Sequence, residues 1–271
     1  MRSARRNDRR RRASATPKLV AGVAFITVGF FTIPLVGLLG RASWSTFVHD
    51  LSSAAASEAL RLSLLCSFGA MALSVCFGMP LAWWLARTDA SGRALVRALV
   101  LLPMVLPPVV GGVALLSAFG RNGVVGAPLW DWFGIQFTFT TLGVVLAETF
   151  VALPFFVITA EAALRSLDGR FAEAASTLGA SPGVVFRRVT LPLVAPSLVA
   201  GAVLSWARAL GEFGATMTFA GNIAGETRTL PLAVYLELDT RPDVAVALSL
   251  VLVAVSLAII VALRDRWSPV S

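Results

Sequence analysis

Few residues in this sequence could carry catalytic or metal chemistry. There is one histidine, His49, and two cysteines, Cys66 and Cys76, which stand ten positions apart in one apolar run. A zinc site needs three or four such ligands, and two cysteines ten positions apart on one helix cannot reach each other to form a disulfide. We expect the cysteines to be packing residues, and we expect neither a catalytic residue nor a metal site.

Nucleotide chemistry is also missing from the sequence. The single lysine, Lys18, follows Thr16 and Pro17 rather than a glycine-rich loop. A Walker-type phosphate site requires that loop, because its backbone amides bind the phosphates. If the protein uses ATP, another chain must hydrolyse it.

Three charged residues stand inside apolar runs: Arg208, Glu212 and Glu148. Such a charge costs about 2.5–3.5 kcal/mol on insertion scales, so it usually faces a bundle interior or a water path. Arg208 and Glu212 are four positions apart and could pair on one helix face. Two interpretations stay open for this pair, a pathway or gate role and a structural pair near the outer interface. Glu148 could lie near a pathway or bond to a neighbouring helix.

These residues need long apolar elements to hold them. Of 271 residues, 57% are hydrophobic and 14% are charged, which indicates an integral membrane protein. A span takes about 20 apolar residues, and runs without two-residue alternation are typical of helices. We therefore predict an all-α membrane protein with six spans, the fifth of which includes Arg208 and Glu212. The spans are predicted at 19–40, 62–86, 98–120, 138–160, 193–219 and 244–263.

The distribution of positive charge predicts the orientation. Seven of the 23 basic residues are arginines in the first twelve positions. This basic tail, 1–18, is interpreted as a topology or lipid-headgroup signal, and no nucleic-acid partner is expected. With both termini in the cytoplasm, seventeen basic residues lie inside and five outside, or nine against five without the tail. The first span is interpreted as a retained anchor rather than a cleaved signal peptide.

The third predicted span is rich in helix-bending residues. Pro103, Pro107 and Pro108 each free a backbone carbonyl one turn earlier, and Gly111 and Gly112 permit close approach of another helix. One interpretation is a kinked helix that lines a pathway. The other is that proline and glycine are simply common in membrane helices.

The loop between the fourth and fifth predicted spans, 165–192, favours two short helices. The stretch RFAEAASTL predicts a helix over 170–178, with Phe171, Ala175 and Leu178 on one apolar face. Gly179 suits the left-handed residue that ends a helix, and Ser181 followed by Pro182 is a typical helix start.

The second short helix is expected to end in basic residues. Arg187 and Arg188 suit the negative end of its dipole, and Leu191 with Pro192 is expected to turn the chain back into the membrane. Such short helices are marginal alone in water, so the apolar face needs a surface. That surface could belong to the protein's own spans or to a groove on another protein.

The same loop resembles the EAA motif of bacterial ABC-importer permeases. Glu173-Ala174-Ala175, three residues, Gly179, nine residues, and VTLP at 189–192 follow that pattern, although its last tetrad usually opens with isoleucine. In that family the loop docks into a groove on the ATP-binding subunit. The resemblance therefore implies an ATPase-coupling role for Glu173, Ala174, Ala175, Gly179, Arg187, Arg188, Leu191 and Pro192.

Three further stretches resemble the molybdate branch of these permeases and, more distantly, the sulfate branch. They are LPMVLPPVVGGVALLSAFGRNGVVGAPL at 102–129, ARALGEFGAT at 207–216 and GNIAGETRTLPLAVY at 221–235. The resemblance covers most of 60–265, whereas the arginine-rich tail has no counterpart.

The resemblance implies a type I importer permease of the molybdate- and methionine-like kind in the bacterial cytoplasmic membrane. It implies a homodimer with two copies of an ATP-binding subunit, which holds ATP and Mg²⁺, and an external oxyanion-binding protein. The chain itself would hold no cofactor, would not be an enzyme, and would move molybdate by alternating access. Because the chain ends eight residues after the last predicted span, any oxyanion-sensing domain is expected on another subunit. The candidate pathway or gate residues are Arg208, Glu212, Pro107, Pro108 and Glu148.

Several alternatives stay open. The cargo could be sulfate, thiosulfate or tungstate. A self-sufficient channel or an ion-coupled carrier is a rival of another class, and an intramembrane enzyme lacks the histidine and cysteine residues that it would need.

Overall fold

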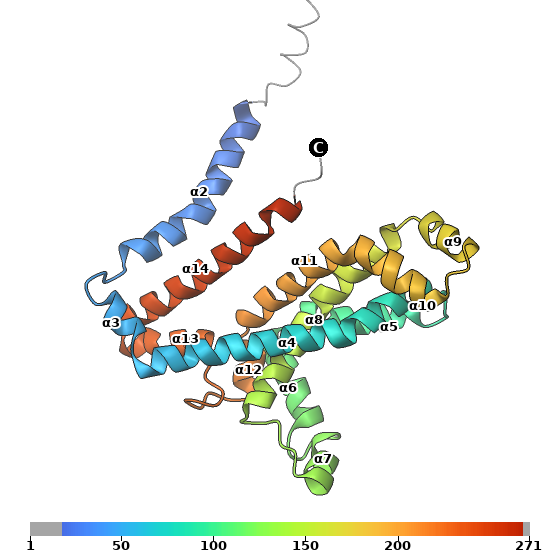
Figure 1. Cartoon of the computed structure of the whole chain (residues 1–271). Helices are drawn as coiled ribbons and strands as arrows, with labels where there is room; N and C mark the ends of the chain where they lie inside the picture. Colours follow the sequence, from blue (N-terminus) through green and yellow to red (C-terminus); the bar gives the residue numbers. More distant parts are fainter. Residues whose placement is uncertain (1–17, 268–271) are drawn as a thin grey trace, which may run out of the picture. The chain divides into compact units, whose positions relative to one another are not determined.

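The computed structural model describes residues 18–267 and the side chains up to residue 261 (Figure 1). Every regular element in this part of the chain is a helix. Most of the predicted basic tail, 1–17, lies outside the described residues. The chain divides into two units, Met1–Trp44 and Ser45–Ser271, which are described separately.

The described part of the first unit is one apolar helix, α2, Lys18–Gly40. Its bounds agree with the predicted span at 19–40. No residue of α2 is buried. The hydroxyls of Thr27 and Thr32 donate to backbone carbonyls of the same helix, those of Val23 at 2.9 Å and Val28 at 2.8 Å. A helix that is apolar all round and keeps its polar groups satisfied internally suits a lipid environment.

The second unit holds the remaining helices, and its longest elements pack side by side (Figure 1). In chain order they are α3 Phe47–Leu51, α4 Ala54–Arg87, α5 Arg93–Val105, α6 Pro108–Phe119, α7 Gly126–Phe133, α8 Thr141–Ser166, α9 Arg170–Thr177, α10 Pro182–Val185, the π-helical turn η1 Phe186–Thr190, α11 Leu191–Leu210, α12 Gly214–Phe219, α13 Leu230–Thr240 and α14 Pro242–Trp267.

Five helices of the described chain are long and apolar enough to cross a membrane, against six predicted spans. They are Lys18–Gly40, Ala54–Arg87, Thr141–Ser166, Pro182–Leu210 and Pro242–Val261.

The third predicted span, 98–120, is not one helix. It is divided into α5 and α6 at Leu106 and Pro107, whose backbones are extended (φ −66°, ψ 137° and φ −54°, ψ 134°). Each of these residues precedes a proline, and a following proline disfavours the helical conformation. The two consecutive X-Pro steps therefore end the helix, which corrects the prediction of a helix that is only bent here.

The fifth predicted span, 193–219, differs at both ends. Its helix is continuous from Pro182 to Leu210, so Leu191 and Pro192 do not turn the chain but lie within the helix. A π-helical turn makes this possible, since the Leu191 amide donates to the Phe186 carbonyl five residues earlier, and Pro192 has no amide to offer. At the other end, α11 stops at Leu210 and α12 begins at Gly214.

Caps explain where two other predicted spans begin. Helix α4 starts eight residues before the predicted 62, because Ser53 accepts a hydrogen bond from the Ala56 amide at 3.3 Å. Helix α8 starts at Thr141 rather than 138, because Thr140 accepts from the Gly143 amide at 3.2 Å.

The core lies where α4, α8 and α11 pack together. Its largest cluster of buried residues is Ala82, Leu85, Phe156, Val157, Ala160, Leu164 and Val194. Small residues allow the approach, since a Cβ at Gly78 would lie 2.7 Å from the Phe156 ring. Between α4 and α11, Trp206 Nε1 donates to Ser67 Oγ at 2.8 Å and the Trp206 ring stacks on Phe68 at 4.6 Å.

Candidate functional site

Helix α9 carries the predicted EAA residues and is held at its start by an acidic side chain. Asp168 accepts hydrogen bonds from the Arg170 backbone amide at 3.0 Å and from Arg170 Nε at 2.8 Å. The Arg170 hydrogen bonds lower the pKa of the Asp168 carboxyl below its ordinary value. The carboxylate thus stabilises the first turn of α9, where the helix dipole favours negative charge.

The predicted apolar face of α9 is uncovered in this chain. Leu178 is 88% exposed and Phe171 is 54% exposed, while Ala175 is half-buried. Glu173 and Ala174 are also exposed. The sequence left two surfaces open for this face, the protein's own helices or a groove on another protein. The protein's own helices do not cover it.

The predicted turn at Gly179 is confirmed. Its φ is +83°, the Gly179 amide donates to the Ser176 carbonyl at 2.9 Å, and the Ala180 amide donates to the Ala175 carbonyl at 3.1 Å. This pair of hydrogen bonds is the Schellman motif, which ends a helix at a left-handed residue.

The second half of the loop differs from the prediction: it is not a second short helix that ends at Arg187 and Arg188, because α10 continues through η1 into α11. Ser181 is extended and precedes α10, but its side chain makes no capping hydrogen bond. The Ser181 carbonyl accepts from the Val184 and Val185 amides instead, at 2.9 and 3.0 Å. Arg187 and Arg188 lie in η1 and are exposed. The loop thus contains one short helix, α9. The turn at Gly179 joins α9 to the first residues of the long helix Pro182–Leu210.

Arg208 and Glu212 form the predicted pair, although not on one helix face. Arg208 bonds to Glu212 Oε2 at 2.7 Å, while α11 ends at Leu210 between them. Glu212 is 2% exposed, and its Oε1 accepts from the Ala215 amide at 2.8 Å. One carboxylate therefore joins the end of α11 to the start of α12.

Of the two predicted prolines, Pro108 lies against this same bend. A Cβ at Gly214 would be 2.6 Å from Pro108 Cβ, and one at Gly112 would be 2.6 Å from Thr218 Cβ. Helix α6 therefore packs against α12 at closest approach, as Figure 1 also shows. The structure brings Pro108 next to Gly214, two residues after Glu212.

Glu148 is buried in α8 at 1% exposure. Within the described part of the chain, its Oε2 has no hydrogen-bond partner. A buried polar atom without a partner is costly, so the position of Glu148 is not explained by packing alone.

Sequence reasoning missed a charged cluster that joins α5 to α8. Arg97 donates from a terminal guanidinium nitrogen to Glu161 Oε1, and Arg165 Nε lies 3.0 Å from the same oxygen. The cluster borders a cavity of about 290 Å³. The spacing of four positions between Glu161 and Arg165 could have predicted their pairing on one helix. No local spacing could have predicted the contact of Arg97, which is 64 positions from Glu161.

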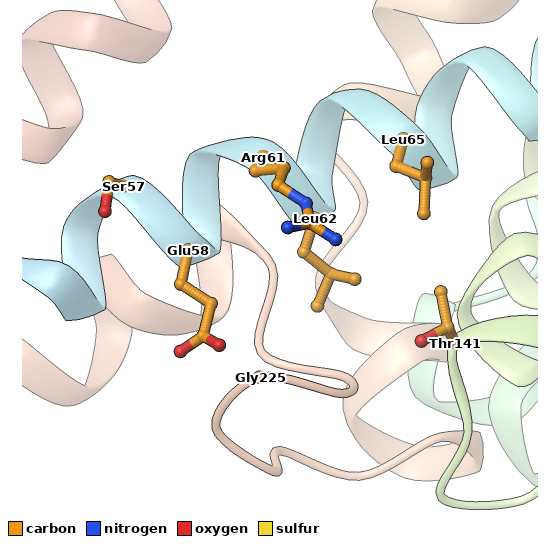
Figure 2. Close-up of a pocket in the computed structure, with 7 residues that line it drawn as sticks. All are labelled: Ser57, Glu58, Arg61, Leu62, Leu65, Thr141 and Gly225. Carbon is orange, nitrogen blue, oxygen red and sulfur yellow. The ribbon is translucent and has the colours of Figure 1, made fainter.

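A second cavity, of about 370 Å³, lies beside the first turns of α4 and was also missed (Figure 2). Glu58 and Arg61 line it from α4, together with Thr141 at the start of α8 and Gly225 in the loop before α13. The Thr141 hydroxyl donates to the Glu226 carbonyl at 2.9 Å. This cavity presents one acidic and one basic side chain, those of Glu58 and Arg61.

The metal and thiol residues do not gather into a site. Among residues 18–267, no group of three or more histidine, cysteine, aspartate or glutamate side chains could hold a metal ion. Cys66 is buried and Cys76 is exposed, and the two do not form a disulfide.

The chain is similar to transport proteins over most of its length. The family model described as the inner membrane component of binding-protein-dependent transport systems matches residues 78–268. The molybdenum transport system permease protein ModB of Mycobacterium tuberculosis is 47% identical over 247 residues, 91% of each chain. ModB of Escherichia coli K12 is 44% identical over 78% of this chain and 92% of its own. The sulfate transport system permease protein CysT of Salmonella typhimurium is 37% identical over 86% and 84% of the two chains.

Solved structures share the fold. A chain of a bacterial ABC transporter that imports the acidic polysaccharide alginate aligns with a TM-score of 0.71 and 22% identity, over 91% of this chain and 94% of that one. A chain of the inward-facing methionine transporter MetNI aligns with a TM-score of 0.58 and 18% identity, over 78% and 95% of the two chains. The chain has the fold of an ABC importer permease, and it belongs to the family of inner membrane components of binding-protein-dependent transport systems.

Proposed function

We propose that this chain is the membrane-spanning subunit of an ATP-driven importer of molybdate. The observation that carries the proposal is the 47% identity to a molybdenum permease over nine-tenths of both chains. The sulfate permease is also similar, at 37% identity, and sulfate is the second candidate cargo. Tungstate and thiosulfate share the chemistry of these oxyanions and are further candidates.

The proposed topology has six crossings with both termini in the cytoplasm. Helices α5 and α6 together would form one further crossing, the third along the chain, which brings the number from five to six. Their 13 and 12 residues give about 19 and 18 Å at 1.5 Å per residue, and the two together are long enough for a bilayer core of about 30 Å. In this orientation the basic end of the unit, with α9, Arg97 and Arg165, faces the cytoplasm.

We propose that α9 docks into a groove on a separate ATP-binding subunit, which holds ATP and Mg²⁺. The exposed side chains of Phe171 and Leu178 support this, because an amphipathic helix with an uncovered apolar face is suited to a hydrophobic groove. Glu173, Arg187 and Arg188 would add polar contacts around it. The assembly would be a homodimer of this chain with two ATP-binding subunits, and the pathway would lie between the two copies.

The continuous helix Pro182–Leu210 offers a mechanical link from this loop to the Arg208–Glu212 bend. Its 29 residues correspond to about 43 Å, and it places the coupling loop and the bend at opposite ends. ATPase movement would rock this helix and change the bend, which is a form of alternating access. An external binding protein would deliver the oxyanion. The carboxylates of Glu148 and Glu212 would not bind an anionic cargo.

The experiment is transport into vesicles. The chain is reconstituted alone, or with its ATP-binding subunit and binding protein, and uptake of labelled molybdate is measured with and without ATP. We expect uptake only from the complete assembly with ATP. Uptake by the chain alone would indicate a channel or carrier instead. A binding protein that retains sulfate but not molybdate would assign the chain to the sulfate branch.

A further inference from the structure

The charged cluster of Arg97, Glu161 and Arg165 has more positive than negative charge. The Glu161 side chain is 9% exposed and bonds to both guanidinium groups through one oxygen atom, Oε1. The Arg97 and Arg165 side chains keep 35% and 39% of their surface exposed. One carboxylate therefore serves two arginines, and the cluster keeps a net charge of +1.

The two guanidinium groups also keep unused donors. Each arginine side chain has five N–H groups. The buried Nε of Arg97 has no hydrogen-bond partner among residues 18–267. The nearby Arg93 differs, because it bonds to Asp89 at 3.2 Å and to the Thr88 carbonyl at 2.8 Å. The uncompensated positive charge of the cluster is thus shared by Arg97 on α5 and Arg165 on α8, and Arg165 also donates to the Leu85 carbonyl at 3.5 Å.

The adjoining cavity of about 290 Å³ has two chemically different parts. Arg97, Glu161 and Arg165 form its charged part, and the walls are aliphatic. The aliphatic lining residues are Leu85, Val100, Leu101, Val157, Ile158 and Ala162. Beyond the cavity, α5 exposes further apolar side chains, with Leu95 at 66% and Leu99 at 59%.

We propose that this cavity binds the headgroup of an anionic phospholipid. The phosphate would accept hydrogen bonds from Arg97 and Arg165, and the first part of an acyl chain would lie along Val100 and Ile158. Arginine suits this ligand, because its planar donors match two phosphate oxygens at once. Basic pockets between membrane helices at the cytoplasmic side are a general type of lipid-headgroup site. A free oxyanion such as molybdate would fit the arginines but not the aliphatic walls, which would only desolvate it.

The test is native mass spectrometry of the assembled complex, which counts bound lipids. The complex is incubated with phosphatidylglycerol or with zwitterionic phosphatidylcholine. We expect phosphatidylglycerol to be retained preferentially. Arg97→Gln and Arg165→Gln should each weaken that retention about fivefold, since an arginine near a membrane surface contributes about that factor. Arg241→Gln is the matched control, because Arg241 is also paired with a glutamate four positions away but lies far from the cavity and should leave retention unchanged.

Two further variants distinguish a lipid site from a cluster of ion pairs that only holds α5 against α8. Glu161→Gln removes the competing carboxylate and should strengthen phosphatidylglycerol retention, whereas a cluster of that kind would only lose stability. Ala162→Phe fills the aliphatic part from an exposed position and should weaken retention with all three charges intact. If an arginine variant fails to assemble, these two variants still decide.

Three results would overturn the proposal. The first is equal retention of phosphatidylglycerol and phosphatidylcholine by the unaltered complex. The second is full retention by an assembled Arg97→Gln/Arg165→Gln variant. The third is displacement of phosphatidylglycerol by excess sodium molybdate, which would make the site one for free oxyanion. None of these results depends on which cargo the protein transports.

Discussion

The guanidinium of Arg208 bonds to Glu212 Oε2 at 2.7 Å across a helix end, while the other carboxylate oxygen accepts from the Ala215 amide. Two positions four residues apart thus meet without a continuous helix between them. Because Glu212 is almost fully buried, both bonds form in a site with little competing water. The bend between α11 and α12 consequently depends on one carboxylate.

Replacing Glu212 should destabilise the protein. We expect Glu212→Ala to cost about 2 kcal/mol, because it removes the acceptor of the Ala215 amide in the first turn of α12 and the partner of a partly buried guanidinium. Glu212→Gln should cost less, since its amide oxygen can still accept from Ala215. Thermal unfolding of the purified protein in detergent measures both. Glu237→Gln, at the more exposed pair with Arg241, is the control and should not change the melting temperature. A Glu212→Ala protein as stable as the unaltered one would contradict this role.

Gly179→Ala should impair transport without preventing membrane insertion. A Cβ at Gly179 meets no atom within 4 Å, but its φ of +83° costs a non-glycine residue about 1–2 kcal/mol. The strain should displace α9, so ATP hydrolysis would continue while uptake falls. Gly179→Pro should act more strongly, because proline requires a φ near −65°. Gly183→Ala is the matched control, since Gly183 also has open space but no positive φ. Unaltered uptake by Gly179→Pro at equal expression would count against the coupling role.

Leu178→Ala should weaken binding of the ATP-binding subunit. Leu178 is 88% exposed in this chain, and burying a leucine in a partner's groove contributes about 1.5–3 kcal/mol. We expect the affinity for that subunit to fall about tenfold or more, measured by titration of the purified components. Val124→Ala is the comparison, because Val124 is 87% exposed but lies in the loop before α7. Equal affinities for the two variants would place the docking surface elsewhere.

Gly112→Ala should destabilise the contact of α6 with α12. The new Cβ would lie 2.6 Å from Thr218 Cβ and 3.0 Å from the Ala215 carbonyl oxygen, which is backbone and cannot easily move. Overpacking of this kind costs about 1–3 kcal/mol. Gly111→Ala, one position earlier, would meet only the Phe150 ring at 3.3 Å and should cost less. The ratio of folded to aggregated protein on heating compares the two, and equal behaviour would exclude a close α6–α12 contact.

Local features of this protein could be predicted from its sequence because they depend on neighbouring residues. The first membrane helix, the helix over 170–177 and the turn at Gly179 follow from apolar runs, helix propensity and the backbone freedom of glycine. The pairing of Arg208 with Glu212 also follows from their spacing, even though the helix ends between them.

Other features were misjudged although the sequence carried a signal. Two successive X-Pro steps at Leu106 and Pro107 end a helix, but hydropathy alone makes 98–120 look like one span. Likewise, Pro192 suggests a break, whereas the π-helical turn before it keeps the helix continuous from Pro182 to Leu210. Hydropathy reports composition along the chain and does not report which backbone hydrogen bonds are kept.

The sequence by itself determined that this is a helical membrane protein with a short helix that ends at Gly179, since composition and short-range spacing suffice for both. Only the tertiary structure decided that α9 keeps its apolar face uncovered, that Pro108 packs against Gly214, and that Arg97 meets Glu161 from 64 positions away. These contacts depend on how separate helices approach one another, and helix–helix approach is set by the packing of many side chains together. No single stretch of the chain encodes it.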